Sequence, residues 1–261
     1  MSNLLTTAAH GIAILTINRP DARNAINGEV CDELLSRLTS LSEDEQIRVV
    51  ILTGAGSAAF CAGGDVKHMD GIAKQSFDDR LANLRRWGRI TLLLHNMPKI
   101  TIAMVNGIAA GAGLSLAAAC DLRFAARSAR FATAYARIAR SGDFGGSFLL
   151  TRLIGGARAR ELYLLGEIID SAKADNFGLV NRVFEDAELS TETMVIARRL
   201  ADGPPIAYGY IKQNLFAAEN MPLAEMVEME ALHHARTGET AEHLEAVKAF
   251  RDRRTPNFKG L

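Results

Sequence analysis

Hydrophobic residues follow two alternating patterns through the first half of the chain. Short runs rich in Ile, Val and Leu predict strands, whereas apolar residues three and four positions apart predict helices. The strands are expected at 11–18, 47–53, 100–105 and 120–126, and the helices over 27–41, 78–95 and 111–119. Strands and helices in alternation are typical of an α/β core.

After residue 126 the pattern becomes almost entirely helical. Helical spacing covers 148–154, 157–165, 171–177, 189–201, 206–219, 223–236 and 240–253, and a last strand is expected within 178–184. Each of these late helices carries an apolar stripe that must be buried, so we expect them to pack on the core or on another subunit. We therefore predict a core over 1–200 and a helical C-terminal part over 201–261.

Charge and cysteine usage narrow the range of functions. The 261 residues contain 30 Lys+Arg and 30 Asp+Glu, so the net charge is zero. This charge balance argues against electrostatic binding of nucleic acid over a broad surface. Cys31, Cys61 and Cys120 are far apart and odd in number, which favours neither a metal site nor a disulfide framework and indicates a cytoplasmic protein. No apolar run is long enough to span a membrane, and we expect no secretory signal.

Two glycine-rich segments are the first candidates for chemistry. Phe60–Asp65 contains Gly63-Gly64, and Gly111-Ala112-Gly113 opens an apolar helix directly after a strand. Small residues allow close approach to the main chain, and the first N–H groups of a helix have no partner within it. The segments are therefore either tight packing turns or two halves of an oxyanion hole. Neither matches a P-loop or a dinucleotide fingerprint.

These segments, together with several others in the same order, resemble the crotonase, or enoyl-CoA hydratase/isomerase, superfamily. The matching motifs are Asn18-Arg19-Pro20 with Arg23-Asn24, Phe60–Asp65, Asn106–Gly113, Cys120-Asp121, Gly145–Gly155 and Ala174–Val180. The resemblance covers essentially the whole chain. It implies an α/β fold, a crotonase-like spiral of ββα units with a helical C-terminal part for trimerisation. It also implies a homotrimer or a dimer of trimers.

The resemblance further implies an acyl-CoA thioester as substrate, with coenzyme A entering as part of that substrate and with no other cofactor and no metal. The backbone N–H groups of Gly64 and Ala112 would then hold the thioester oxygen. The residues expected to line the substrate site are Ala62, Asp65, Val66, Arg23, Lys67, Ser115, Tyr135, Phe250 and Arg253. Arg23, Lys67 and Arg253 are expected near the CoA phosphates and Phe250 on the adenine; the alternative is a solvated charge or a core aromatic.

The chain departs from the hydratases of this superfamily at two positions. Those enzymes carry two glutamates, and the matching positions here are Ser115 and Tyr135, neither of which is a carboxylate base. The remaining acid is Asp143, just before Phe144-Gly145-Gly146-Ser147. It is either a helix cap or first-turn acid, or a single carboxylate that shuttles a proton. In the second case it is similar to the acid of isomerase members, including the epoxide isomerase type of phenylacetyl-CoA breakdown.

We therefore predict an acyl-CoA isomerase that shifts a double bond or isomerises an epoxide through a stabilised enolate. Enoyl-CoA hydratase, acyl-CoA hydrolase and dehalogenase remain alternatives on the same fold. From other classes, a CoA-binding pseudoenzyme fits Ser115 and Tyr135 equally well. An RNA-binding relative is disfavoured by the zero net charge.

Overall fold

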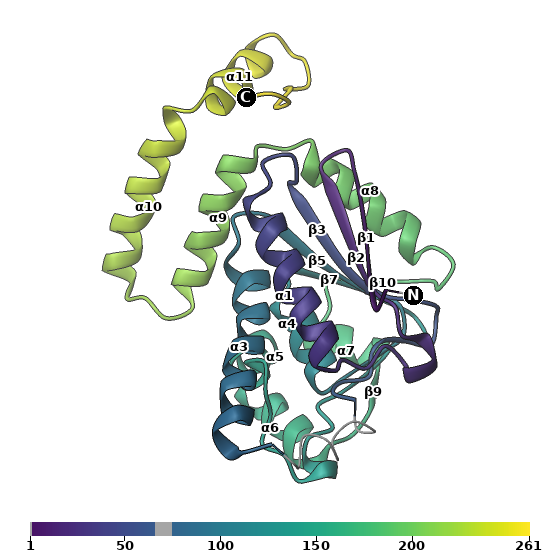
Figure 1. Cartoon of the computed structure of the whole chain (residues 1–261). Helices are drawn as coiled ribbons and strands as arrows, with labels where there is room; N and C mark the ends of the chain where they lie inside the picture. The colour runs from purple at the N-terminus through teal and green to yellow at the C-terminus, as the bar shows by residue number, and fades with distance from the viewer. Residues whose placement is uncertain (1, 66–74) are drawn as a thin grey trace.

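Two sheets organise the protein, which is described here from a computed structural model covering residues 2–65 and 75–261 (Figure 1). The larger sheet has six strands in the order β1-β2-β3-β5-β7-β10, and the smaller has four in the order β4-β6-β8-β9. Together with the helices that follow them, these strands form the mixed α/β fold expected from the sequence.

Four parallel neighbours form the centre of the large sheet. They are β2 (Ile12–Ile17), β3 (Val49–Gly54), β5 (Ile100–Val105) and β7 (Leu122–Ala126). All lie within the predicted runs except that β3 extends one residue further, to Gly54. The short β10 (Arg182–Phe184) adds to β7 in parallel, where the last strand was expected. The antiparallel edge strand β1 (Leu4–Ala9) was not predicted, because only Leu4 is buried and the other five residues are exposed.

The small sheet gives the fold its repeating form. Its strands are β4 (Ala59–Cys61), β6 (Ile108–Ala110), β8 (Arg130–Ala132) and β9 (Ile169–Asp170). The pairs β3–β4, β5–β6 and β7–β8 each place their first strand in the large sheet and their second in the small one, and helices follow. This arrangement confirms the expected spiral of ββα units. Strands of two or three residues are too short to give a hydrophobic pattern, so the sequence alone does not predict this sheet.

The first helices follow the predicted patterns closely. Helix α1 (Gly28–Glu43) begins after Asn27, whose side chain accepts a hydrogen bond from the Val30 amide, and it buries the apolar stripe expected from its spacing. Helix α3 (Phe77–Asn96) is capped by Ser76 in the same way. Helix α4 (Ala112–Ala119) is buried at every residue, so it lies inside the fold and positions whatever its first turn carries.

The later helices form the second half of the molecule. They are η3 (Ala136–Ile138), α5 (Gly146–Ile154), α6 (Gly156–Leu165), α7 (Ser171–Phe177), α8 (Leu189–Ala201), α9 (Pro205–Ala218), α10 (Leu223–Gly238) and α11 (Ala241–Arg251). A short helix, η1 (Pro20–Ala22), lies much earlier, between β2 and α1. Helix α8 packs against the large sheet. Among the described residues, no helix is both long and apolar enough to cross a bilayer.

The C-terminal helices extend away from the body of the protein. Helix α9 is attached by Lys212, whose ammonium pairs with Asp121 at 2.8 Å. Figure 1 shows α10 and α11 extending away from the sheets, with α11 at the opposite end of the molecule from α5 and α6. The division of the chain at residue 200 stays a prediction.

Candidate active site

The two glycine segments lie directly against each other. A Cβ atom on Gly113 would overlap the carbonyl group of Cys61, so only glycine allows the first turn of α4 to approach β4 this closely. A Cβ atom on Gly63, where φ is +99°, would lie 3.7 Å from the amide nitrogen of Ala112. The main chain around Gly63 and Gly64 is thereby placed beside the start of α4.

Two amide groups are left free at this junction. Ala112 is the first residue of α4, and Gly64 lies on the neighbouring loop. Within residues 2–65 and 75–261, neither N–H group has a hydrogen-bond partner, although the adjacent Gly111 amide donates to Ala132 at 3.0 Å. Free donors beside the positive end of a helix suit an oxygen that gains negative charge. The geometry agrees with an oxyanion hole, whose role stays a prediction.

Buried polar contacts fix the loop that carries Gly64. The Asp65 carboxylate pairs with the Arg19 guanidinium at 2.7 Å, and both side chains are largely buried. Asn24, fully buried at φ +55°, donates from its side-chain amide to the carbonyl oxygens of Ala55 and Ala59 at 2.9 and 2.7 Å. The Asn-Arg-Pro and Arg-Asn motifs and Asp65 therefore position this loop.

The other residues predicted to bind substrate near this loop differ in placement. Ala62 is half-buried and its amide donates to the Arg23 carbonyl at 3.1 Å, which places both beside the glycine segment. The Arg23 side chain itself is exposed. Val66 and Lys67 lie outside the described residues.

Three side chains, Ser115, Tyr135 and Asp143, form a polar cluster near the start of α4. Ser115 is buried on α4, Tyr135 lies just before η3, and Asp143 lies between η3 and α5. The Tyr135 hydroxyl donates to Oδ1 of Asp143 at 2.6 Å, and the Ser115 hydroxyl lies 3.2 Å from the Tyr135 hydroxyl. The structure thus brings together three predicted site residues, the first and last of which are 28 positions apart in the chain.

Asp143 is not a helix cap. The N-cap position of α5 is Gly145, the first turn contains no acidic residue, and the Asp143 carbonyl rather than its carboxylate accepts the Gly146 amide at 3.1 Å. The interpretation of Asp143 as a capping or first-turn acid is therefore wrong. Burial raises the pKa of Asp143, partly opposed by the Tyr135 hydrogen bond and the charge of Arg140. A carboxyl group with a raised pKa suits both acceptance and return of a proton.

Tyr163 is a member of this cluster that the sequence analysis missed. Its ring, on α6, stacks on Tyr135 with centroids 5.9 Å apart and planes 8° apart. Its hydroxyl is buried and makes no hydrogen bond within the described part of the chain. A Cβ atom on Gly146 would overlap both the Ser115 and Tyr163 hydroxyls, so a larger residue there would displace these side chains. Tyr163 lies in an ordinary helical pattern, which gave no signal of its place.

Cys61 lies beside the glycine segments as a neutral side chain. It is fully buried, and burial raises the pKa of its thiol to about 12. This environment agrees with a small buried filler rather than a nucleophile. Across the described ranges 2–65 and 75–261, no three His, Cys, Asp or Glu side chains are grouped so that they could hold a metal ion.

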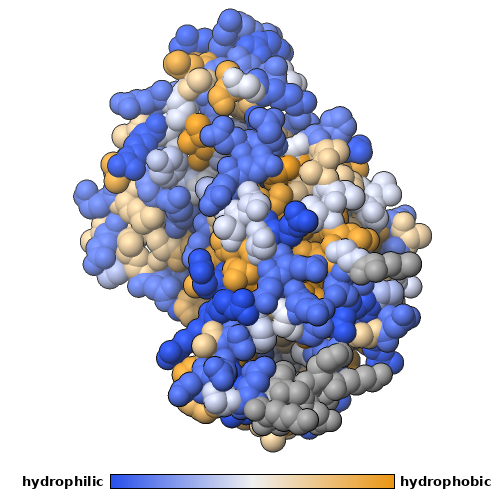
Figure 2. Space-filling view, viewed as in Figure 1, coloured by the Kyte–Doolittle hydropathy of each residue, from blue (hydrophilic) through white to orange (hydrophobic). Residues whose placement is uncertain are grey.

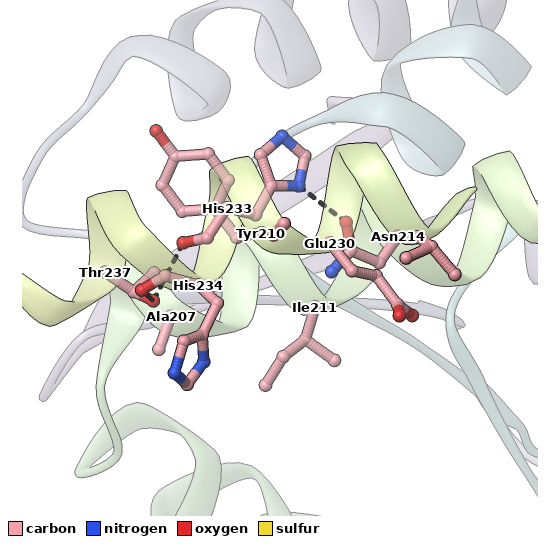
Figure 3. Close-up of a pocket in the computed structure, with 10 residues that line it drawn as sticks. Ala207, Tyr210, Ile211, Asn214, Glu230, His233, His234 and Thr237 are labelled. Atoms are coloured by element: carbon pink, nitrogen blue, oxygen red, sulfur yellow. Dashed lines mark hydrogen bonds between the residues drawn. The ribbon is translucent and has the colours of Figure 1, made fainter. Parts of the chain in front are cut away.

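A hollow on the surface lies away from the candidate site, between α9 and α10. It has a volume of about 630 Å³, and Figure 3 shows Tyr210, Asn214 and His233 along it, with His233 Nδ1 2.5 Å from the Asn214 side-chain oxygen. It contains none of the predicted site residues. Phe250 and Arg253 also lie apart from the polar cluster, because α11 extends away from the body, and Phe250 is 86% exposed. Within one chain, these two residues do not join the site.

Comparisons with known proteins identify the family of this chain. The sequence profile of the enoyl-CoA hydratase/isomerase family matches residues 7–261, and the chain belongs to this family. It is 35% identical to a 1,2-epoxyphenylacetyl-CoA isomerase of Escherichia coli, over 100% of this chain and 99% of that protein. It is 33% identical to an (E)-benzylidenesuccinyl-CoA hydratase of Thauera aromatica, over 95% and 96% of the two chains.

Solved structures bear out the crotonase fold. The crystal structure of an enoyl-CoA hydratase from Bacillus anthracis matches with a TM-score of 0.94 and 32% identity, over 100% of both chains. The family shows that the chain is an enzyme of the hydratase/isomerase type, and an acyl-CoA thioester substrate is consistent with it. Because the relatives include both isomerases and hydratases, the family does not define which of the two reactions this enzyme performs.

Proposed function

We propose that this enzyme is an acyl-CoA isomerase in which Asp143 moves one proton. The Asp143 carboxylate removes a proton from a carbon of the acyl chain, and the released electron pair moves toward the thioester oxygen. The amides of Gly64 and Ala112 stabilise the resulting enolate, and Asp143 returns the proton at a different carbon. The double bond shifts, or an epoxide is isomerised, with no change in mass. The scheme uses only residues of this chain and the coenzyme A that the substrate carries.

The observation that carries this proposal is the composition of the polar cluster. Ser115 and Tyr135 occupy the positions where the resemblance expects the two hydratase glutamates. The Tyr135 hydroxyl contacts the Asp143 carboxylate, and the Ser115 hydroxyl contacts the Tyr135 hydroxyl and the main-chain carbonyl of Asp143. Adding water requires activation of the water and delivery of a proton. Moving a proton within one substrate needs a single group that accepts it and gives it back. One half-buried carboxylate beside two free amides fits the second task.

The test is a set of incubations with 2-enoyl-, 3-enoyl- and epoxyphenylacetyl-CoA, followed by mass and ultraviolet analysis. A rearranged product of unchanged mass is expected, and Asp143→Asn should lower its rate by at least about 100-fold, the size of a lost proton-transfer group. Asp175→Asn, which changes an exposed aspartate on α7, is the matched control and should retain full rate. Gain of water, release of free coenzyme A, or CoA binding without turnover would each refute the isomerase assignment.

The proposed assembly is a homotrimer or a dimer of trimers. It is supported by the exposed apolar side chains of the C-terminal helices, Ile206, Ile211, Leu215, Leu223, Val227, Leu232, Leu244 and Phe250. Figure 2 shows hydrophobic residues on the flank formed by α9 and α10. In such an assembly Phe250 and Arg253 would meet coenzyme A bound to a neighbouring subunit. Light scattering after size-exclusion chromatography should give three or six times the 28.2 kDa chain mass.

A further inference from the structure

The hydroxyl of Tyr135 makes the shortest side-chain contact of the polar cluster. It lies 2.6 Å from Asp143 Oδ1, a separation typical of a hydroxyl that donates to an ionised carboxylate. Tyr135 is itself 6% exposed, with its ring stacked on Tyr163. Burial raises the pKa of Tyr135, so its hydroxyl keeps its proton and remains a donor at neutral pH.

The direction of the hydrogen bonds follows from the number of available protons. An ionised carboxylate only accepts, so Tyr135 gives its one proton to Asp143 Oδ1. The Tyr135 oxygen is then free to accept. It is the nearest of three acceptors around the Ser115 hydroxyl, at 3.2 Å, whereas the carbonyl oxygens of Gly111 and Asp143 each lie 3.3 Å from it. Oδ2 of Asp143 has no hydrogen bond within the described part of the chain. The two carboxylate oxygens are therefore inequivalent.

We propose that Tyr135 is a positioning residue, which holds the Asp143 carboxylate through Oδ1 and leaves Oδ2 as the atom that removes and returns the proton. This inference rests on the proposed function of Asp143 as proton carrier. With Oδ1 occupied by a donor, an incoming proton binds Oδ2, and the same oxygen releases it at the second carbon. Ser115 and Tyr135, at the two positions expected for hydratase carboxylates, thus become a hydroxyl chain that orients one acid.

Few charges face Asp143. Arg140 lies on its own segment, Tyr163 faces it from α6, Cys61 from β4 and Cys31 from α1. Burial raises the pKa of Tyr163 and of each of these cysteines to about 12, so all three groups are neutral at pH 7. Among the described residues, only the charge of Arg140 would then remain to offset the burial of the ionised carboxylate once the Tyr135 hydroxyl is removed. Asp143 would then be protonated at higher pH than in the native enzyme.

The experiment compares Tyr135→Phe with Tyr163→Phe. Both substitutions remove one phenol oxygen from stacked rings in the same cluster, and Tyr163 makes no hydrogen bond to Asp143. Tyr135→Phe should move the acid limb of the kcat/KM profile to higher pH and lower kcat by about 10-fold, with little change in KM. Tyr163→Phe should leave the acid limb where it is in the native enzyme.

A second readout does not depend on turnover. The carboxyl carbon of Asp143 can be titrated by ¹³C NMR, with Asp143→Asn used to assign its signal. Its midpoint should rise in Tyr135→Phe and stay in place in Tyr163→Phe. Equal midpoints in native enzyme and Tyr135→Phe, or equal shifts in both variants, would overturn the positioning role. If no isomerase activity is found, the proposed function fails, while this titration still decides whether Tyr135 orients the carboxylate.

Discussion

Replacement of Gly113 by alanine tests whether contact between main chains sets the geometry of the candidate oxyanion site. Gly113 has ordinary helical backbone angles, so alanine introduces no backbone strain there. The new methyl group would overlap the carbonyl group of Cys61 instead. Because neither partner is the flexible end of a side chain, α4 and β4 must separate, and Ala112 moves away from Gly64.

The expected size of the effect has two parts. Overpacking a filled core costs about 1–3 kcal/mol of unfolding free energy, reduced by the gain of up to about 1 kcal/mol when alanine replaces glycine in a helix. Displacing a catalytic group by about 1 Å costs on the order of 100-fold in rate, close to the effect of losing one oxyanion donor. The loss of kcat should therefore exceed what the loss of stability alone would suggest.

Gly88→Ala is the matched control. Gly88 lies within α3, and a Cβ atom there would meet no other atom within 4 Å. This variant should be as stable as the native protein or up to about 1 kcal/mol more stable, with unchanged kcat. Urea unfolding and steady-state isomerase assays on both variants provide the measurements. A Gly113→Ala enzyme with native kcat and native stability would refute the argument that this contact positions the amides.

Two further predictions concern a buried ion pair and the buried thiols. Lys212→Met should lower the unfolding free energy, measured in urea, by about 3–5 kcal/mol, because the largely buried Asp121 carboxylate loses the cation that pairs with it. The control, Lys248→Met, changes an exposed lysine and should change the unfolding free energy by less than about 0.5 kcal/mol. All three cysteines are buried, and burial raises each thiol pKa to about 12. Iodoacetamide at pH 8 should therefore modify none of them until urea unfolds the protein; rapid labelling of the native enzyme would contradict this.

The parts of the fold that the sequence predicted share one property, a buried pattern long enough to detect. Strands such as β3 are covered on both faces and appear as continuous apolar runs. The edge strand β1 lacks such a pattern because five of its six residues are exposed. The short strands of the second sheet lack one because they form through pairing with neighbours distant in the sequence. Only the resemblance to a known family predicted the ββα spiral.

The candidate site was likewise predicted only in part. Its glycine segments and Asp143 could be found from motifs, but the choice between a cap and a free carboxylate depends on backbone angles. Phe144 and Gly145 both have positive φ, at 49° and 67°, which starts α5 after Gly145 and leaves the Asp143 side chain outside its first turn. Tyr163 reaches the cluster only through the packing of α6.

The close contact of Gly113 with Cys61 has a consequence for how this enzyme changes over evolution. The two amides belong to a helix and a loop held by main-chain contact and by the buried Arg19–Asp65 pair, so their separation does not depend on the side chains of the polar cluster. Ser115 and Tyr135 can therefore be exchanged for other residues while the amides stay in register. New reactions can arise by such exchanges without the cost of rebuilding the two amides that we propose to stabilise the enolate.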